Sequence, residues 1–448
     1  MNERNPYESD DTVDIPDFSS VKVNDDDIDR SIFKMNDFIK IRGGNRLKGE
    51  VTISSSKNAT VAILPAVVLA SEVVKLYDIP EIEDINALVT ILRKLNIKVV
   101  MNEDNFTIDP TEIENVVLDG DEVRKLRASY YFMGALLGRF KHVKMLYPGG
   151  CNLGPRPIDL HLKGFESLGA TVKTDGDNIE IFADELIGDE IYLDIASVGA
   201  TINIMLAAVF AKGRTIIRNA AKEPEIIDLS SMLNKMGAEI RGAGTSDLII
   251  DGVKRLKGCI HDIIPDRIEA GTYICMAAAM GDGVTVKNVI PQHLEALLSK
   301  LEEMGVEMNV GSDFVEVYGA KNLKSIDIQT QTFPGFATDL QQPITPLLCV
   351  ANGESNVNET IYPKRFKHCF ELNKMGANIT VGDAKATIVG PCKLHGTEVT
   401  ATDLRCGAGL IIAGLMADGE TIIHDAYHIY RGYDNIVTKL RNIGGDIE

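Results

Sequence analysis

A short pattern that recurs six times along the chain constrains its fold more than any other feature. In each copy an apolar residue is followed by glycine or asparagine and, after two more residues, by another apolar residue. The copies begin at Leu95, Leu168, Met236, Met304, Met375 and Ile443. Their spacing of about 70 residues exceeds that of the common solenoid repeats, so each copy must belong to a small α/β unit.

The same elements are predicted around every copy. A helix rich in small residues, such as 204–212, leads through a glycine into a β-branched strand, such as 215–218. A second helix, such as 226–236, follows and ends at the repeated glycine, which acts as its C-cap. Alternating strands such as 313–318 come next. Three units lie before residue 260 and three after it, so we expect two domains of three units each.

The chain is expected to close on itself through its N-terminal strands. The sixth copy reaches Glu448 without its final strands, whereas 38–42 and 47–53 have the pattern of those strands. We therefore expect one domain to comprise 37–56 plus 265–448 and the other to comprise 57–264. The chain would cross between them near Ser56 and near Pro265.

Residues 1–36 form an acidic segment without a sustained apolar period. Such a composition is typical of a disordered, solvating tail, and an arm that binds a partner is the alternative. The partner of such an arm is unknown from the sequence.

Composition limits the class of protein. The formal net charge of −19 argues against nucleic acid and against anionic membrane surfaces as partners. The longest apolar runs are shorter than the ~18 residues of a membrane-spanning helix, and the acidic start lacks the pattern of a signal peptide. Seven cysteines without a CxxC pair argue against a disulfide framework and a metal site. We expect a cytoplasmic protein that uses no metal and no cofactor.

One cysteine differs from the other six in its surroundings. Cys151 lies in the segment 147–161, which glycines and prolines interrupt and which also contains Arg156 and Asp159. A neighbouring cation lowers the pKa of a thiol, so Cys151 is a candidate proton donor or nucleophile. The alternative is a turn with an incidental cysteine. The others are expected to be inert core thiols: Cys259, Cys275, Cys349, Cys369, Cys392 and Cys406.

Charged residues recur at equivalent places in the units, either at the start of the first helix or in the loop before the second. If the units are structurally equivalent, these residues lie near helix N-termini on one face of each domain, where anions bind favourably. A cationic cleft would then form from Lys57, Arg127, Arg156, Arg405 and Arg431. Any one of them, taken alone, is also explained as a cap or a surface ion pair.

Two further residues are candidates for chemistry. Asp339 is the carboxylate that we single out as a base, because its neighbours Phe336 and Leu340 suggest partial desolvation, and an N-cap is its alternative role. Lys57 begins a helix, where a positive charge opposes the helix dipole. A bound anion would explain that unfavourable position.

In their order along the chain, these motifs resemble those of the enolpyruvyl transferases. The matching motifs are Ser-Lys-Asn-Ala (56–59), Leu-Arg-Ala-Ser (126–129), Pro-Gly-Gly-Cys-x-x-Gly-x-Arg-Pro-x-Asp-Leu-His (148–161), Ser-Val-Gly-Ala-Thr (197–201), Glu-Pro-Glu-Ile (223–226), Pro-Asp-Arg-Ile-Glu (265–269), Thr-Asp-Leu-Gln (338–341), Ala-Thr-Asp-Leu-Arg (401–405) and Arg-Gly-Tyr (431–433). The resemblance covers 37–448. It implies an α/β fold, a two-domain inside-out α/β barrel of six repeated βαβαββ units, three per domain.

The resemblance is strongest to the family members that act on a nucleotide sugar. It implies transfer of the enolpyruvyl group of phosphoenolpyruvate to the 3-hydroxyl of UDP-N-acetylglucosamine, with release of phosphate, in the first committed step of peptidoglycan synthesis. By this resemblance Cys151 is the proton donor and the target of fosfomycin, and Lys57 and Asn58 contact phosphoenolpyruvate and the sugar. Arg405 and Arg431 correspond to binders of the carboxylate and the phosphate, with Asp403 beside them.

The remaining implied residues contact the UDP-sugar. They correspond to Arg127, Arg156, Pro157, Ile158, Asp159, Leu160, Asp339 and Ile361. Asp339 is expected to face the attacking hydroxyl, which agrees with its proposed role as a base.

Two positions depart from the family pattern. Ile195 stands where the family often carries lysine, so a contact that the lysine would make to the uridine or the phosphates is not expected here. Tyr131 stands where tryptophan is common. Two other functions are weighed against the main one. The first is the sister transferase that acts on shikimate 3-phosphate, whose family does not use the cysteine loop. The second is a catalytically weak paralogue with a regulatory or binding role.

Overall fold

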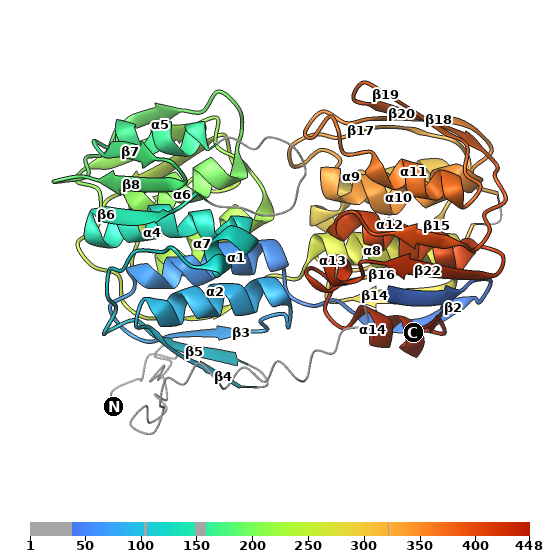
Figure 1. Cartoon of the computed structure of the whole chain (residues 1–448), viewed down its shortest axis with the longest axis horizontal. Helices are drawn as coiled ribbons and strands as arrows, with labels where there is room; N and C mark the ends of the chain where they lie inside the picture. The colour runs from blue at the N-terminus through green and yellow to red at the C-terminus, as the bar shows by residue number, and fades with distance from the viewer. Residues whose placement is uncertain (1–37, 103–104, 148–157, 321) are drawn as a thin grey trace, which may run out of the picture.

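Two separate hydrophobic cores organise the chain. The structure, a computed structural model, describes residues 38–102, 105–147, 158–320 and 322–448. One core gathers buried side chains between Ala59 and Ile263, and the other gathers those of 39–53 and 268–447. We call the first body lobe A (57–264) and the second lobe B (38–56 and 265–448), and they lie side by side in Figure 1. We propose that the two lobes are the two domains expected from the repeats.

Lobe A contains three units, each with an inner helix, a strand, an outer helix and further strands. The elements of the first unit are α1 (Lys57–Ala66), η3 (Val67–Leu69), β3 (Val74–Tyr77), α2 (Glu83–Lys94), β4 (Lys98–Met101) and β5 (Asn105–Asp109). Those of the second are α3 (Asp121–Lys125), η4 (Arg127–Tyr130), α4 (Tyr131–Phe140), β6 (His142–Leu146), α5 (Asp159–Ser167), β7 (Thr171–Asp175), β8 (Asn178–Phe182) and β9 (Glu190–Tyr192). Those of the third are α6 (Val198–Ala208), β10 (Arg214–Arg218), α7 (Pro224–Lys235), β11 (Glu239–Arg241), β12 (Asp247–Asp251) and β13 (Ile260–Asp262).

Lobe B repeats this order, with the N-terminal strands added. The elements of the fourth unit are α8 (Arg267–Met280), β14 (Gly281–Lys287), η5 (Pro291–His293), α9 (Glu295–Met304), β15 (Glu307–Val310), β16 (Phe314–Tyr318) and β17 (Asp327–Gln329). Those of the fifth are α10 (Thr338–Val350), β18 (Gly353–Asn358), α11 (Lys367–Lys374), β19 (Ile379–Gly382), β20 (Lys385–Gly390) and β21 (Glu398–Thr400). Those of the sixth are α12 (Leu404–Met416), β22 (Glu420–His424), α13 (Tyr427–Tyr430), α14 (Ile436–Asn442), β23 (Asp446–Ile447), β1 (Phe38–Arg42) and β2 (Leu47–Thr52).

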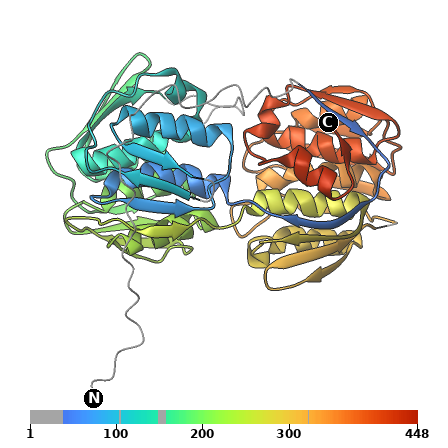
Figure 2. The same ribbon diagram turned by 90° about the horizontal axis from the view of Figure 1, so that it is seen from below.

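The first helices of the units form the centre of each lobe, and the sheets lie outside them (Figures 1 and 2). Helices α4, α6, α8 and α12 are buried along almost their whole length. A helix that is apolar or small on every side needs neighbours all round, which explains its central position. The protein therefore has the two-domain inside-out α/β fold that the resemblance implied.

Glycine allows the central helices to approach one another closely. A Cβ atom at Gly134 of α4 would overlap the carbonyl oxygen of Asn203 in α6. The same Asn203 accepts a hydrogen bond from the Gly134 N–H through Oδ1 at 2.9 Å. In lobe B a Cβ at Gly409 of α12 would lie 2.7 Å from the carbonyl oxygen of Gln342 in α10. The small residues of these helices therefore serve helix packing.

The N-terminal strands complete the ring of units in lobe B. Strand β1 pairs antiparallel with β22, with Phe38 opposite His424. Strand β2 pairs parallel with β14, with Val51 opposite Val286, and so joins the sheet of the fourth unit to the end of the sixth. Strand β13 closes lobe A in the same way by pairing parallel with β3. The strand pairing predicted for the N-terminal segments is confirmed.

The repeated glycine ends the second helix of a unit, as predicted. Gly305, directly after α9, has φ 89°. This is a left-handed conformation, in which a residue with a side chain is strained and glycine is not. Equivalent positive φ angles occur at Gly169, Gly237, Gly376, Gly444 and, in the first unit, Asn96. Asparagine is the residue that best replaces glycine in this conformation, which explains the variation in the first copy.

The two chain crossings between the lobes run next to each other. The Ser56 N–H donates to the carbonyl oxygen of Ile264 at 2.7 Å, and the Asp266 N–H donates to that of Ser54 at 2.9 Å. A β-bridge also joins Ser55 to Pro265. The lobes are therefore connected by a short, hydrogen-bonded pair of segments. Within the described residues, no helix is long and apolar enough to span a membrane.

Candidate active site

Lys57 of lobe A and Arg431 of lobe B contact the same carboxylate. Asp84, in the first turn of α2, accepts a hydrogen bond from Lys57 Nζ on Oδ2 at 2.7 Å and one from Arg431 Nε on Oδ1 at 2.9 Å. All three side chains are largely buried. Burial alone would raise the pKa of Asp84, but the two cations lower it by more than burial raises it. The pKa of Asp84 therefore lies below its usual range. Asp84 was not predicted, because an acidic residue in a first helical turn is common.

Helix caps fix the backbone of Lys57. Ser56 caps α1 by accepting a hydrogen bond from the Ala59 N–H at 3.2 Å. The Lys57 N–H donates to Oδ2 of Asp266, the N-cap of α8 in the other lobe, at 3.0 Å. Lys57 thus begins its helix at the point where the lobes meet. In the structure a carboxylate of the protein, that of Asp84, lies next to Lys57, and the bound anion expected there stays a prediction.

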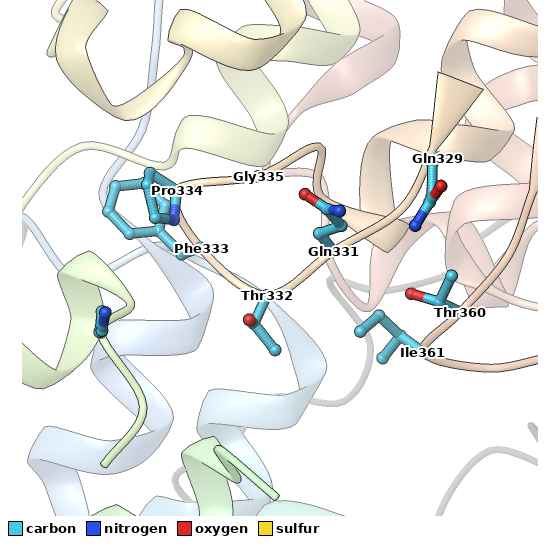
Figure 3. Close-up of a pocket in the computed structure, with 9 residues that line it drawn as sticks. Gln329, Gln331, Thr332, Phe333, Pro334, Gly335, Thr360 and Ile361 are labelled. Carbon is cyan, nitrogen blue, oxygen red and sulfur yellow. The ribbon is translucent and has the colours of Figure 1, made fainter. Parts of the chain in front are cut away.

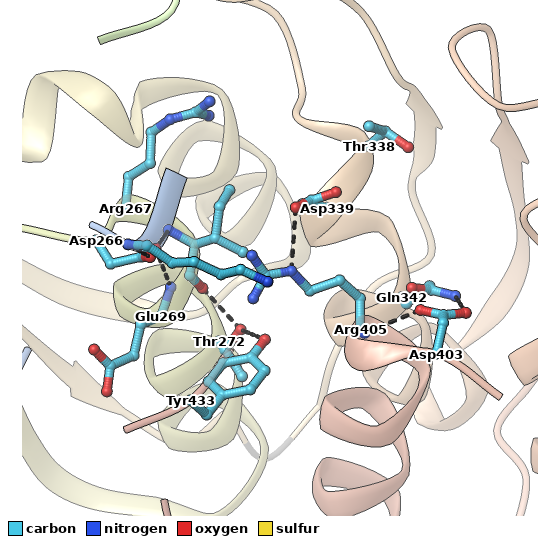
Figure 4. Close-up of polar contacts among 12 residues, drawn as sticks. Asp266, Arg267, Glu269, Thr272, Thr338, Asp339, Gln342, Asp403, Arg405 and Tyr433 are labelled. Atoms are coloured by element: carbon cyan, nitrogen blue, oxygen red, sulfur yellow. Dashed lines mark hydrogen bonds and ion pairs between the residues drawn. The ribbon is translucent and has the colours of Figure 1, made fainter. Parts of the chain in front are cut away.

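A second cluster surrounds Asp339, near the start of α10. Its Oδ1 accepts from Arg365 Nη1 at 2.6 Å. Its Oδ2 accepts from Arg405 Nε at 3.1 Å (Figure 4). Burial raises the pKa of Asp339, but the two guanidinium groups lower it well below its usual range. The desolvation expected of Asp339 is present, but in this arrangement the two arginines outweigh its effect on the pKa, and the role of Asp339 as a base stays a prediction. Its alternative role is excluded, since Ala337 is the N-cap of α10.

Arg365 is a residue of the cluster that the sequence did not single out. Besides Asp339 it contacts Thr338, to whose Oγ1 its Nη1 donates at 3.1 Å. It lies in the loop before α11, a position where charged residues recur in other units. That recurrence was the feature of the sequence that could have pointed to Arg365. It was too general to separate Arg365 from its neighbour Lys364.

Asp403 positions Arg405. As N-cap of α12, it accepts hydrogen bonds on Oδ1 from the backbone N–H groups of Arg405 and Cys406, at 3.0 and 3.1 Å. Its Oδ2 accepts from Gln342 Nε2 at 3.2 Å (Figure 4). Asp403 is therefore a helix cap that holds the backbone of Arg405 in place.

The arginines of this cluster have unused donors. Nη1 of Arg405 and Nε of Arg365 are buried and have no hydrogen-bond acceptor within the described part of the chain. The guanidinium of Arg405 lies 5.2 Å from the ring centre of Tyr433, whose hydroxyl is 2.9 Å from Oγ1 of Thr272 (Figure 4). A buried donor without an acceptor costs about 1–3 kcal/mol. An anion bound between the arginines would recover that cost.

A cavity of about 690 Å³ lies beside Ile361, the expected sugar contact. Its walls come from both lobes, and its lining residues are Lys222 from lobe A and Gln329, Gln331, Thr332, Phe333, Pro334, Gly335, Thr360 and Ile361 from lobe B (Figure 3). The buried carboxylate of Glu359 shapes this wall, because its Oε1 accepts from the Ile361 N–H at 2.9 Å.

Further contacts between the lobes lie close to this cavity. Arg267 Nε of lobe B donates to Glu225 Oε1 of lobe A at 3.3 Å. The Phe333 N–H of lobe B donates to Glu223 Oε1 of lobe A at 3.4 Å. The cavity is therefore bordered by polar contacts that join the lobes.

The other expected residues of lobe A are spread over three elements. Arg127 begins η4, with its guanidinium 5.7 Å from the Tyr130 ring. Asn58, the second residue of α1, is half-buried. Around the start of α5, Ile158 is buried, Asp159 is exposed and Leu160 is half-buried. The positions of Cys151, Arg156 and Pro157 lie outside the described residues.

The remaining histidine and cysteine side chains show no sign of a metal site. Where the chain is described, no group of three or more His, Cys, Asp or Glu side chains could hold a metal ion. Five of the six cysteines other than Cys151 are buried, as expected, and Cys392 is half-buried. Burial raises the pKa of Cys259 to about 11.

Comparison with known proteins gives consistent matches over nearly the whole chain. A sequence model of the family described as EPSP synthase (3-phosphoshikimate 1-carboxyvinyltransferase) matches residues 41–440. UDP-N-acetylglucosamine 1-carboxyvinyltransferase 2 of Staphylococcus aureus is 55% identical over 410 residues, which are 91% of this chain and 98% of the relative. The protein of the same name from Staphylococcus epidermidis is 54% identical over the same shares.

Solved structures resemble the fold closely. The enolpyruvyl transferase NikO from Streptomyces tendae gives a TM-score of 0.85 at 26% identity, covering 92% of this chain and 98% of its own. An EPSP synthase from Acinetobacter baumannii gives a TM-score of 0.70 at 19% identity, covering 92% and 99%. The second likeness concerns the fold alone.

Proposed function

This chain belongs to the enolpyruvyl transferase family described by the EPSP synthase match, and from that membership we propose its reaction. It transfers the enolpyruvyl group of phosphoenolpyruvate to the 3-hydroxyl of UDP-N-acetylglucosamine and releases phosphate. The reaction is the first committed step of peptidoglycan synthesis. The observation that carries this proposal is the 55% identity, over 91% of the chain, to transferases named for UDP-N-acetylglucosamine.

The clusters of cations fit a small substrate with two anionic groups. We assign the phosphate of phosphoenolpyruvate to Lys57 and Arg431, and its carboxylate to Arg405 and Arg365. The buried donors of these two arginines support the second assignment. Guanidinium groups bind carboxylates through paired, charge-assisted hydrogen bonds, which are stronger than neutral ones.

The reaction requires a proton donor for C3 and a proton acceptor for the attacking hydroxyl. The 3-hydroxyl oxygen attacks C2 of phosphoenolpyruvate while C3 takes a proton, which we assign to Cys151, and Asp339 takes the hydroxyl proton. In the second step C3 gives a proton back to the thiolate that we assign to Cys151, the double bond re-forms, and the bond from C2 to the phosphate oxygen breaks. Cations around the phosphate stabilise the negative charge that leaves with it.

Asp339 becomes a better base when substrate is bound. In the described arrangement two arginines hold its pKa well below its usual range. A substrate carboxylate that takes hydrogen bonds from Arg405 and Arg365 withdraws part of this stabilisation. The pKa of Asp339 then rises towards its ordinary value at the moment when the hydroxyl is in place.

The nucleotide sugar occupies the space between the lobes. We assign its sugar to the cavity beside Ile361 and to Asn58, and its nucleotide to the residues of lobe A that the motifs indicate: Arg127, Arg156, Pro157, Ile158, Asp159 and Leu160. Ile195, at a position where the family often has lysine, is 67% exposed and offers no charge to the nucleotide. We also propose a cytoplasmic location, because the described cysteines are all unpaired.

A phosphate-release assay with phosphoenolpyruvate and each of two acceptors tests this function. The expected result is release with UDP-N-acetylglucosamine and none with shikimate 3-phosphate. Release with shikimate 3-phosphate alone would identify the sister reaction. The absence of release with both acceptors would favour a binding or regulatory role.

A further inference from the structure

Asp84 lies outside every motif recognised in the sequence. Its carboxylate nevertheless joins the two lobes, because it contacts both cations that we assign to the phosphate of phosphoenolpyruvate, Lys57 and Arg431. Its partner Arg431 is 347 residues away in the chain, and the ion pair between them crosses from lobe A to lobe B. Its other partner, Lys57, belongs to lobe A. One carboxylate thus holds two cations that the proposed function assigns to the same phosphate group.

Asp84 lies on a helix that is anchored in the core of lobe A. It occupies the first turn of α2, and the residues that follow it on the same helix, Ile85 and Leu88, are buried in the core of lobe A. The backbone of Lys57 is held by its own helix start and by Asp266. Arg431 is the partner that arrives from the other lobe. Lobe A thus holds both Asp84 and Lys57, and the carboxylate is the group that aligns Arg431 of lobe B with Lys57.

Electrostatics require a negative charge at this position. Lys57 and Arg431 would repel each other if they were brought together in a buried site without one. The lowered pKa of Asp84 keeps its carboxylate ionised at neutral pH, so the compensating charge is always present. The three groups together carry one net positive charge, which leaves them attractive to an anion.

Lys57 has donors beyond the one that Asp84 uses. An ammonium group has three N–H donors, and the contact with Asp84 takes one of them. An anion can therefore bind to Lys57 on the side away from Asp84 without displacing the carboxylate. This geometry favours a supporting role for the carboxylate over competition with the substrate.

We propose that Asp84 is a positioning residue for the phosphate site, because it holds Arg431 of lobe B beside Lys57 of lobe A before substrate enters. The inference rests on the proposed function for the identity of the anion. Asp84 itself touches neither substrate. It acts through the two cations, and it links closure of the lobes to assembly of the anion site.

The test compares Asp84→Asn and Asp84→Glu with Glu83→Gln. Glu83 is the control position, because it is exposed and directly precedes Asp84 in the first turn of α2. Glu83→Gln removes one negative charge, as Asp84→Asn does. For each variant, kcat and the KM of both substrates are measured in the phosphate-release assay. Binding of inorganic phosphate to the free enzyme is measured by titration calorimetry, and folding by thermal unfolding.

For Asp84→Asn we expect the KM of phosphoenolpyruvate to rise about tenfold or more, because two charge-assisted contacts are lost. Phosphate binding should weaken in parallel, and the KM of UDP-N-acetylglucosamine should change much less. Asp84→Glu keeps the charge at a shifted position and should restore part of the phosphate affinity. Glu83→Gln should behave as the unaltered enzyme.

Equal or tighter phosphate binding by Asp84→Asn would overturn the proposal, because it would show that the carboxylate is inert or competes. If Asp84→Asn fails to fold, Asp84→Glu decides, since wild-type phosphate affinity in that variant would contradict a role in alignment. If the unaltered enzyme shows no transfer to UDP-N-acetylglucosamine, the proposed function fails. The phosphate titrations then still decide the role of Asp84.

Discussion

Nε of Arg405 lies 3.1 Å from Oδ2 of Asp339, although 66 residues separate them in the chain. Asp339 also accepts from Arg365, so its carboxylate is held from two sides. Since the arginines stabilise the ionised form, the pKa of Asp339 is well below its usual range. Its reactivity therefore depends on what else these arginines bind.

Replacing Arg365 with methionine should raise the pKa of Asp339. The change removes one of the two cations but keeps much of the apolar stem, so the remaining shift comes from Arg405 and burial alone. A titration of aspartate carboxyl groups by 13C NMR, with Asp339 assigned by Asp339→Asn, measures the change. Arg214→Met is the control, because Arg214 pairs with the distant Asp251 at the surface. An unchanged Asp339 titration in Arg365→Met would contradict the electrostatic account.

The buried Glu269 of α8 should make stability depend on pH. Burial raises its pKa from 4.5 to about 7, although Lys439 lies 2.7 Å away. Between these values the folded chain binds a proton that the unfolded chain has lost, so the free energy of unfolding falls as pH rises through this window and levels off above it. The size of this contribution is on the order of 3 kcal/mol.

Denaturant unfolding at pH 5 to 8 measures the effect of Glu269 as a difference between proteins. Glu269→Gln cannot titrate, so its free energy of unfolding should lack the part of the decline that Glu269 causes. Glu302→Gln, at an exposed position of α9, should keep the full decline. Identical pH profiles of the Glu269→Gln and unaltered proteins would show that this residue does not titrate in the window.

Replacing Gly134 with alanine should destabilise lobe A. The added methyl group would overlap the backbone of Asn203, so α4 and α6 would have to move apart in a closely packed core. Overpacking of this kind costs about 1–3 kcal/mol. Chemical denaturation measures the change, with Gly382→Ala as the control, since a Cβ there would meet its nearest atom at 3.8 Å. Equal stability of the two variants would show that the helices adapt freely.

Substitutions of Cys151 test the role that the sequence assigns to it. Cys151→Ala should abolish turnover or trap product, because no side chain would deliver the proton to C3. Cys151→Asp should keep activity, because a carboxylic acid also donates a proton, and should escape inactivation by fosfomycin. Incubation with fosfomycin followed by the phosphate-release assay measures both effects. Inactivation of the Cys151→Asp variant would refute the assignment.

The repeat pattern was sufficient to predict the architecture. The recurrent glycine at helix ends, seen at Gly305, and the strand patterns of 38–42 and 47–53 led to six units and a closed ring in lobe B. These features are local, since a left-handed C-cap and a strand alternation are written in a few neighbouring residues. The sequence also grouped Lys57, Arg405 and Arg431 as cations of one site, which stays a prediction; in the structure Lys57 and Arg431 meet at Asp84, and Arg405 contacts Asp339.

Roles within the site were harder to predict, because they depend on which groups meet. The sequence suggested that apolar neighbours make Asp339 basic, yet Arg365 and Arg405 reverse the effect. Asp403 was expected beside Arg405 and Arg431, and the structure adds that its carboxylate caps α12. Local composition predicts burial, whereas the sign of a pKa shift follows from the nearest charges, which come from other units.

The sequence by itself determined the units, their number and the helix starts from which Lys57 and Arg405 extend, because propensity and periodicity act over short stretches of chain. Only the tertiary structure decided that Asp84 holds Lys57 and Arg431 together across the lobes. That contact depends on the closing of two rings and on the angle between them. No segment of the chain records it, because an ion pair between residues 347 positions apart has no local signature.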